Sequence, residues 1–186
     1  MTFLRRYTDR LSFLHLQRLG RSAWAVAAAL ALCALAACDP QRLSELQPGV
    51  STEADVRDRF GAPENVWNEP DGGRTLEYNR QPAGQVNYMM TIGPDGRLQA
   101  ARQVLTPEVF ARVQPGMEMS QVRRMLGKPA KTMYFALKAE TEVDWRFVSP
   151  GGTPQVFTVV HGGDQRVIRT RSADDMEAPE FRGGGR

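Results

Sequence analysis

One histidine and three carboxylates in this chain are candidates for acid–base or metal chemistry, because of their residue types and their spacing. His161 precedes a Gly-Gly-Asp turn, and Glu140, Glu142 and Asp144 alternate upstream of it. Zinc sites and catalytic triads need convergent partners, and His161 has no second nitrogen or sulfur ligand in the chain after the leader described below, so we favour a structural or solvated histidine. The three acids would point to one side of a strand. A solvated strand face is favoured over an acid–base pair, because nothing indicates that these groups are desolvated.

The cysteine at position 38 has a different chemistry available, the attachment of a lipid. It follows Leu35, Ala36 and Ala37, and the four residues together resemble a bacterial lipobox. Small side chains let an extended backbone enter the signal peptidase, and the Cys38 thiolate takes up a diacylglyceryl group. Cys33 is a poor alternative because a bulky leucine precedes it and the apolar run would be too short. We predict a peptidase recognition site at residues 35–37 and a lipid anchor at Cys38, with acyl chains such as palmitate; an ordinary secretory peptide with a chance cysteine is the alternative.

The segment before Cys38 has the pattern of a removable export signal. Its apolar run, residues 23–37, has 15 residues and five arginines precede it, whereas a membrane-spanning helix needs ~20 apolar residues. We therefore predict a lipoprotein signal peptide at residues 1–37, and the long basic head suggests a start codon further downstream. Removing its five arginines and one aspartate from 24 basic and 21 acidic residues leaves 19 and 20, a formal charge of −1. The basic isoelectric point thus belongs to the leader, and we predict no nucleic-acid partner.

Two stretches of the remaining chain repeat at an offset of 67 residues. Residues 39–50, DPQRLSELQPGV, align with residues 106–117, TPEVFARVQPGM. Each begins with a capping oxygen, has proline at the first helical position and stops at Pro-Gly, which predicts a short helix capped by Asp39 or Thr106. A second helix follows in each copy, with Ser51 or Thr52 as the first cap, Ser120 as the second cap, and a Gly-x-Pro stop.

Four strands follow the two helices in each copy, and Gly-rich turns at residues 93–96 and 162–165 predict hairpins. The predicted fold class is α+β, with two tandem helix–helix–antiparallel-sheet units at residues 38–105 and 106–172. Units this small bury little apolar area alone, so we expect them to share an interface. The polar, Gly-rich residues 173–186 predict a disordered tail.

The segment Pro-Gly-Met-x-x-x-x-Val-x-x-x-Leu-Gly-x-Pro, residues 115–129, resembles the signature of the BamE/SmpA/OmlA lipoprotein family, and residues 48–63 carry it with one extra residue. The resemblance implies two helices on a small antiparallel sheet, and a role beside the machinery that inserts β-barrels into the outer membrane. A tandem of such units is also similar to the fold of the β-lactamase inhibitor protein. We therefore expect a periplasm-facing, protein-binding scaffold in outer-membrane assembly or envelope integrity, and the alternative is a membrane-tethered inhibitor of a periplasmic enzyme.

Further candidate contact residues are cationic or aromatic. A basic face is predicted at Arg123, Arg124, Lys128 and Lys131; a solvated helix side is favoured, and contact with anionic phospholipid is the alternative. The Gly-Lys-Pro at residues 127–129 lacks the spacing of a phosphate loop.

Aromatic residues expected on strands would form the cores or, where exposed, anchor envelope proteins: Trp67, Tyr78, Tyr88, Tyr134, Trp145 and Phe157. We find no catalytic constellation and predict no enzyme, no metal and no cofactor.

The residue after the predicted lipidated cysteine bears on which membrane holds the protein. Asp39 reads either as the helix N-cap or, by resemblance to enterobacterial sorting rules, as a signal for retention in the inner membrane. Pro40 weakens the sorting interpretation. We favour the periplasmic face of the outer membrane and keep the inner membrane as the alternative.

Overall fold

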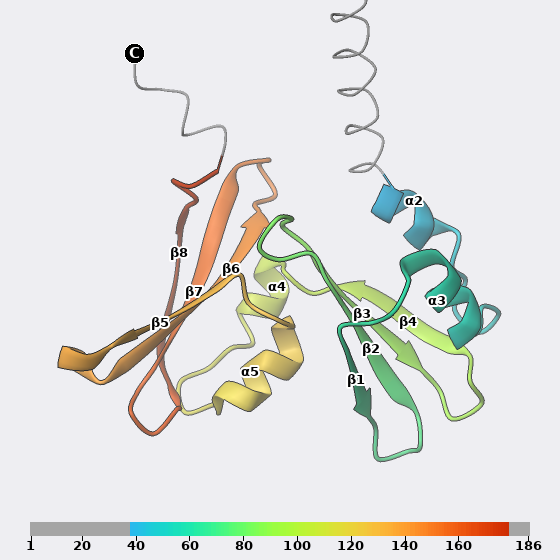
Figure 1. Ribbon diagram of the computed structural model, residues 1–186, viewed down its shortest axis with the longest axis horizontal. Coiled ribbons are helices and arrows are strands. Elements are labelled where there is room, and N and C mark those ends of the chain that lie inside the picture. Colours follow the sequence, from blue (N-terminus) through green and yellow to red (C-terminus); the bar gives the residue numbers. More distant parts are fainter. Residues whose placement is uncertain (1–37, 179–186) are drawn as a thin grey trace, which may run out of the picture. The chain divides into compact units, whose positions relative to one another are not determined.

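The chain folds as an α+β protein with two four-stranded antiparallel sheets (Figure 1). The computed structural model describes residues 38–178, so the predicted signal peptide, including Leu35, Ala36 and Ala37, lies outside the described residues. The chain divides into two units, Met1–Glu45 and Leu46–Arg186. In the first unit the structure describes α2, Cys38–Ser44. None of the helices within residues 38–178 has the length and apolar character needed to span a membrane.

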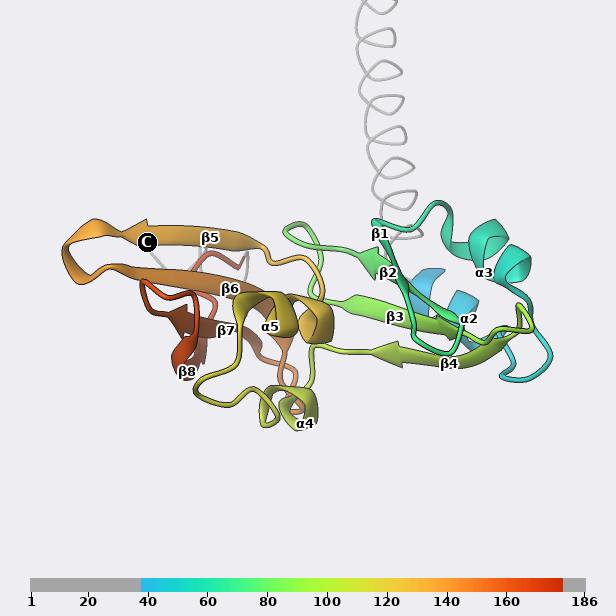
Figure 2. The same ribbon diagram turned by 90° about the horizontal axis from the view of Figure 1, so that it is seen from below.

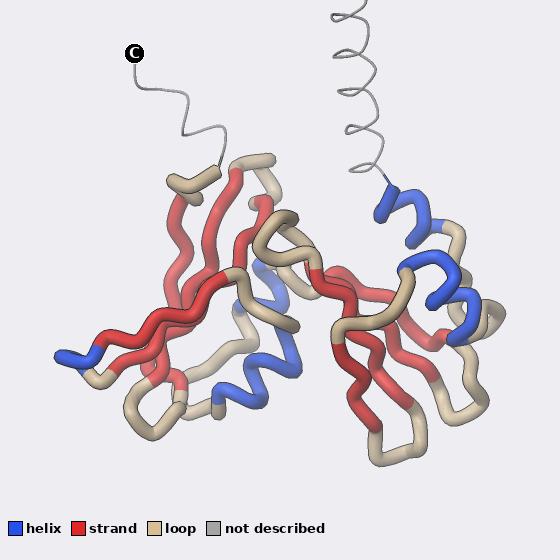
Figure 3. Tube along the Cα trace, viewed as in Figure 1, coloured by secondary structure: helices blue, strands red, loops and turns tan. Residues whose placement is uncertain are grey.

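The second unit contains both sheets, and each sheet is a meander in which neighbouring strands follow chain order (Figures 2 and 3). Its first half comprises α3 Glu53–Phe60, β1 Asn65–Asn68, β2 Arg74–Asn79, β3 Asn87–Ile92 and β4 Leu98–Gln103. Its second half comprises α4 Pro107–Phe110, α5 Met119–Leu126, β5 Lys131–Phe135, the 3₁₀ turn η1 Ala136–Lys138, β6 Glu140–Val148, β7 Pro154–His161 and β8 Val167–Asp174.

Two of the four predicted N-cap residues are found at the start of a helix. The Thr106 side chain accepts from the Val109 N–H at the start of α4, and Thr52 forms a capping box with Asp55 at the start of α3. The prediction of Ser120 as a cap is wrong, because α5 begins at Met119 and the Gln121 side chain accepts from the Glu118 N–H at 2.8 Å. A glutamine three residues after the cap can accept from the N–H of the cap residue, which is half of a capping box. The first helix also differs, since Asp39 lies inside α2 and not at an N-cap position.

The Thr52 cap gives the first stability prediction. Thr52→Ala should lower the free energy of unfolding by about 1 kcal/mol, because it removes the hydroxyl that accepts from the Asp55 N–H. Ser120→Ala is the matched control, and it should change stability by less than about 0.5 kcal/mol because Ser120 is an exposed residue inside α5. Urea unfolding of both variants measures the difference; equal losses would contradict the assignment of Thr52 as the cap.

The two halves repeat the same contact between the last hairpin and the start of the second helix. Arg97 forms an isolated β-bridge with Thr52, and Arg166 forms one with Glu118. The two arginine side chains donate to carbonyls of the loops before α3 and α5, at 3.0 and 2.8 Å. Both hairpins also contain a register shift just before their turns. Each half therefore fixes its second helix to its own last hairpin by the same backbone pairing.

Aromatic side chains fill both cores. In the first half Phe60 packs on Tyr78 and Tyr88, with ring centroids 5.3 and 5.8 Å apart. In the second half Phe110 stacks on Phe157, with centroids 4.1 Å apart. The second core also includes residues from the end of the first half: Met89, Val104 and Leu105. The two halves therefore share buried apolar surface, as expected for units of this size.

The chain beyond Ala173 differs from the predicted disordered tail. β8 continues to Asp174, and Asp175 and Ala178 are buried. Asp175 accepts from the Arg146 Nε at 2.6 Å. A polar segment can be ordered when a folded surface supplies a partner for its charges, and Arg146 lies 29 residues upstream, beyond the reach of a local sequence pattern.

Candidate binding surfaces

A buried carboxylate joins the two halves. Glu77 on β2 is 0% exposed, and it accepts from Arg123 Nη1 at 2.6 Å and from the Lys128 N–H at 2.8 Å. Beside it, the buried Asn87 Nδ2 donates to the Leu126 and Lys128 carbonyls at 2.8 and 3.0 Å. The first sheet therefore binds the C-terminal end of α5, where helix carbonyls have no partner within the helix.

A glycine makes this close contact possible. Gly127 ends α5 with a φ of +78°, and a Cβ added there would lie 3.0 Å from Asn87 Nδ2 and 3.2 Å from Glu77 Oε1. The Trp145 Nε1–H donates to the Gly127 carbonyl at 2.9 Å. An L-residue would be strained at this φ and would push the first sheet away from the helix end. The Gly-x-Pro stop read from the sequence is therefore also an interface position.

The predicted basic face lies close to this junction, and each of its four cations has an acidic partner within the described chain. Besides Arg123 with Glu77, the pairs join Arg124 to Glu69, Lys128 to Glu64 and Lys131 to Glu177, at 2.5, 2.6 and 3.8 Å. The guanidinium carbons of Arg123 and Arg124 also lie 5.9 and 5.7 Å from the ring centroid of Trp67. Contact of these cations with lipid headgroups stays a prediction, and it would compete with ion pairs already present.

The three acids of β6 lie on one face of the second sheet, as the alternation predicts. The Glu140 carboxylate binds both Arg169 Nη atoms at 2.9 and 2.8 Å, and Glu142 binds Arg171 in the same way at 3.0 and 2.8 Å. These hydrogen bonds hold the pKa of each glutamate below its usual value. Asp144 accepts from the Thr158 hydroxyl at 2.7 Å. Glu140 and Glu142 are thus ionised at neutral pH and are poor proton donors.

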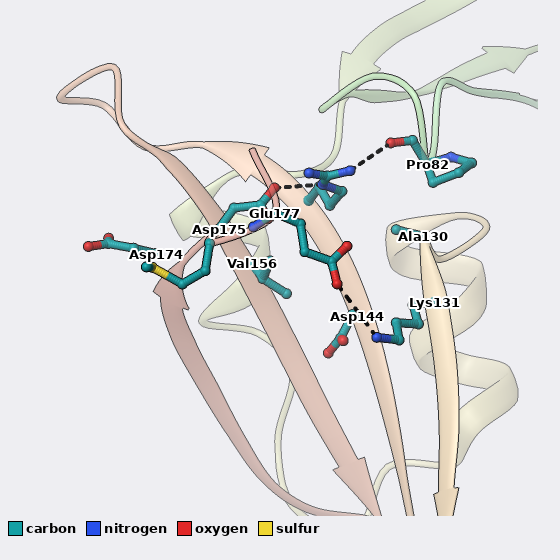
Figure 4. A pocket seen from close by; sticks show the side chains of 10 residues that line it. Pro82, Ala130, Lys131, Asp144, Val156, Asp174, Asp175 and Glu177 are labelled. Atoms are coloured by element: carbon teal, nitrogen blue, oxygen red, sulfur yellow. Dashed lines mark hydrogen bonds and ion pairs between the residues drawn. The ribbon is translucent and has the colours of Figure 1, made fainter. Parts of the chain in front are cut away.

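A cavity of about 280 Å³ lies at the other end of this face (Figure 4). The Arg146–Asp175 pair and the Lys131–Glu177 pair line it, and Pro82 contributes from the first half. The Gln81 amide joins the two halves here, donating to the Arg146 carbonyl at 2.8 Å. Two further carboxylates line the cavity: Asp144 accepts from the Thr158 hydroxyl, and Asp174 accepts from the Gln155 amide at 3.2 Å.

A second hollow, which we call the arginine cleft, has a different character. It has a volume of about 460 Å³ and lies between the first sheet and helices α4 and α5. Apolar side chains from both halves line it, and an ion pair between Arg124 and Glu69 lies at its edge. Arg102 and Arg112 also line it, and neither has an acidic partner among the described residues. The apolar lining residues are Met89, Val104, Val109 and Met125.

His161 is a structural residue of the second core. It is 0% exposed, and neither ring nitrogen has a hydrogen-bond partner of normal geometry among the described residues. Burial lowers the pKa of His161 from its ordinary 6.5, and the nearby backbone of Thr141 opposes this shift. No group of three or more potential metal ligands occurs within residues 38–178. A buried neutral imidazole of this kind has no access to a substrate.

The lowered pKa of His161 predicts how stability changes with pH. Below the unfolded pKa of about 6.5 the unfolded chain binds a proton that the native state resists, so stability is present above this pH and falls below it. His161→Leu should be neutral or stabilising at pH ~7.5, since it removes unpaired buried nitrogens. The free energy of unfolding of the variant, relative to that of wild type, should increase towards pH ~5.5 by at most about 1 kcal/mol per pH unit. Urea unfolding at each pH measures this; a constant difference would contradict a neutral buried His161. Glu140 and Glu142 do not interfere, because their effect begins below their ordinary 4.5.

Among the predicted aromatic residues, the structure separates core residues from one surface residue. Tyr78, Tyr88, Trp145 and Phe157 are buried, whereas Tyr134 is 64% exposed. Trp67 is half-buried beneath the two arginines. Sequence reasoning missed Arg102 and Arg112, which belong to no recognisable motif and line one cavity only in the folded chain.

Comparisons with known proteins do not assign this chain to a family. No family model and no curated protein matches it. One similar solved structure is an osmotically inducible lipoprotein, OsmE, at 25% identity, covering 41% of this chain and 76% of that chain with a TM-score of 0.33. Another is a DUF4309 family protein, YjgB, from Bacillus subtilis, at 20% identity, covering 70% and 82% with a TM-score of 0.27. Scores this low carry no argument about fold or function.

Proposed function

We propose that this protein is a lipoprotein of the bacterial cell envelope that binds other envelope proteins and catalyses no reaction. The anchor is Cys38, which follows the lipobox-like Leu35-Ala36-Ala37. The proposed location is the periplasmic face of the outer membrane. Asp39 makes the inner membrane the alternative, and fractionation of wild type and Asp39→Ser separates the two.

The architecture we propose is a tandem of two copies of one helix–helix–sheet unit, similar to the BamE/SmpA/OmlA lipoproteins. The matched bridges of Arg97 and Arg166 support it, as do the glycines that end α3 and α5 with φ values of +81° and +78°. Phe60 and Leu126 occupy equivalent last-turn positions, and both are buried. In this architecture the arginine cleft is a product of duplication, because its walls come from both copies.

The arginine cleft is the observation that carries the binding function. Two arginines that have no acidic partner among residues 38–178 line it together with apolar side chains. Such a site favours a segment that combines an acidic group with an apolar side chain, since guanidinium groups bind carboxylates in a fixed geometry and the apolar surface adds burial. Catalysis is disfavoured by contrast, because Glu140 and Glu142 are paired with arginines and His161 is buried. The finer proposal is that the bound proteins include components of the β-barrel assembly machinery.

Site-specific photocrosslinking tests this proposal in intact cells. A photoreactive residue at Arg112 should capture one or a few envelope proteins, among them barrel-assembly components. The same probe at Ser172, an exposed position on β8, is the control and should capture none of them. Arg102→Glu should weaken capture at position 112 at least about tenfold, since it replaces attraction by repulsion in the cleft. His161→Leu should leave capture unchanged.

Three outcomes would overturn parts of this proposal. Equal capture at positions 112 and 172 would remove the cleft as the binding site. Recovery of a single soluble hydrolase, without barrel-assembly components, would favour the tethered-inhibitor alternative. Loss of function in His161→Leu with the fold intact would argue for an enzyme. In the proposed function, deletion of the gene also sensitises cells to large or hydrophobic antibiotics.

A further inference from the structure

The β5–β6 hairpin carries exposed apolar side chains at its end. The hairpin tip, residues 133–139, projects beyond α5 and the rest of the second sheet (Figures 1 and 2). Leu137 in the η1 turn is 105% exposed and Tyr134 is 64% exposed, while Met133 is also on the surface. A soluble surface seldom presents a leucine in this way at the end of an ordered hairpin, so the tip is a candidate contact site.

The residues of the tip itself carry only positive charge, and the acids Glu140 and Glu142 on β6 lie opposite Phe135 and Met133. Residues 131–139 contain Lys131 and Lys138 and no acid. Lys138 forms no direct ion pair within residues 38–178, although its charge helps to lower the pKa of Glu140 and of Glu142, and Lys131 is 3.8 Å from Glu177. The first acid after the tip, Glu140, is held by two hydrogen bonds from Arg169. A leucine, a tyrosine and flanking lysines match the interfacial layer of an anionic bilayer, where rings lie at headgroup depth and lysine stems reach towards the phosphates.

An acylated Cys38 would also keep the start of the second unit near a bilayer. Cys38 precedes Leu46 by eight residues, and an extended chain spans at most about 3.6 Å per residue, so an acylated Cys38 holds Leu46 within about 30 Å. A protein partner would have to compete with this permanent neighbour. Local concentration therefore favours the membrane as the occupant of the tip.

We propose that the hairpin tip inserts into the interfacial layer of the membrane that holds Cys38, and so provides a second point of attachment. This inference rests on the lipid anchor of the proposed function. Leu137 and Tyr134 enter the layer between headgroups and acyl chains, and Lys138 contacts anionic headgroups. The Glu140–Arg169 pair at the base limits the depth, because burying that pair in hydrocarbon is unfavourable.

Depth-dependent fluorescence quenching tests the proposal on the full, processed lipoprotein. Ala136→Cys places a free thiol in the tip for a polarity-sensitive dye and keeps Leu137, and no other free thiol remains once the leader is removed and Cys38 is acylated. In vesicles of phosphatidylcholine and phosphatidylglycerol, the dye should shift to the blue and lose about half of its emission when the acyl chains carry bromine, as expected for shallow insertion. Val148→Cys, at the opposite end of β6, is the control and should show neither effect.

A second variant separates insertion from mere proximity. Leu137→Asp in the Ala136→Cys chain should remove most of the quenching while mass spectrometry still detects the acyl chains on Cys38. An acylated, vesicle-bound protein whose tip dye reports water would overturn the tip proposal and leave the anchor standing. Equal quenching at positions 136 and 148 would overturn it in favour of a sheet lying flat. A benzophenone at position 136 that captures one protein and no lipid would make the tip a protein-docking site. Absence of acyl chains would remove the anchor and this inference together.

Discussion

Replacing Glu77 with alanine should lower the free energy of unfolding by about 2–4 kcal/mol. The substitution leaves the Lys128 N–H and the Arg123 guanidinium without their acceptor inside the junction of the two halves. Breaking a fully buried pair from one side costs about 3–5 kcal/mol, and the expected loss is smaller here since Arg123 is 27% exposed. Urea unfolding at neutral pH measures the effect.

The matched control for Glu77 lies a short distance away. Glu64 accepts from the Lys128 Nζ at 2.6 Å, but its side chain is 40% exposed. Glu64→Ala should therefore cost less than about 1 kcal/mol, as is typical of surface ion pairs. Glu77→Leu combined with Arg123→Met should recover part of the loss, because an apolar pair carries no unpaired charge. If Glu77→Ala costs no more than Glu64→Ala, the junction does not depend on the buried carboxylate.

Cys38→Ser should abolish fatty-acid labelling and leave the protein either as an unprocessed precursor or free of the membrane. The expected effect is complete rather than partial. Each buried methylene contributes about 0.8 kcal/mol, and lipid-modified cysteines carry several acyl chains, so the anchor is effectively permanent. Metabolic labelling with palmitate, followed by mass spectrometry of the N-terminal peptide, measures both acylation and the cleavage point.

Cys33→Ser provides the control for this prediction. Cys33 lies within the apolar run and is preceded by leucine, so its replacement should leave labelling and membrane attachment unchanged. Labelling that survives in Cys38→Ser and disappears in Cys33→Ser would move the anchor upstream. A wild-type protein without acyl chains would remove the lipoprotein proposal altogether.

The features that the sequence alone determined are those set by neighbours within a few residues. Thr106 with Pro107, the glycines after α3 and α5, and the turns at residues 93–96 and 162–165 all lie where the sequence predicts them. Caps and tight turns depend on local backbone preferences, so residue type and spacing suffice. Ser120 is the exception. The helix could have started with Ser120 as its N-cap, but it starts with Glu118, whose N–H donates to the Gln121 side chain.

Only the tertiary structure decided which charged side chains are paired with an opposite charge. In sequence Glu77 is one more polar residue on a strand, yet it is buried because Arg123 and Lys128, 46 and 51 residues away, converge on it. Arg102 and Arg112 have no such partner within the described part of the chain and line the cleft. Asp175 is buried because it pairs with Arg146, whereas Leu137 remains outside both cores. Pairing between distant groups depends on which surfaces meet after the local elements have formed, and no local pattern encodes that meeting.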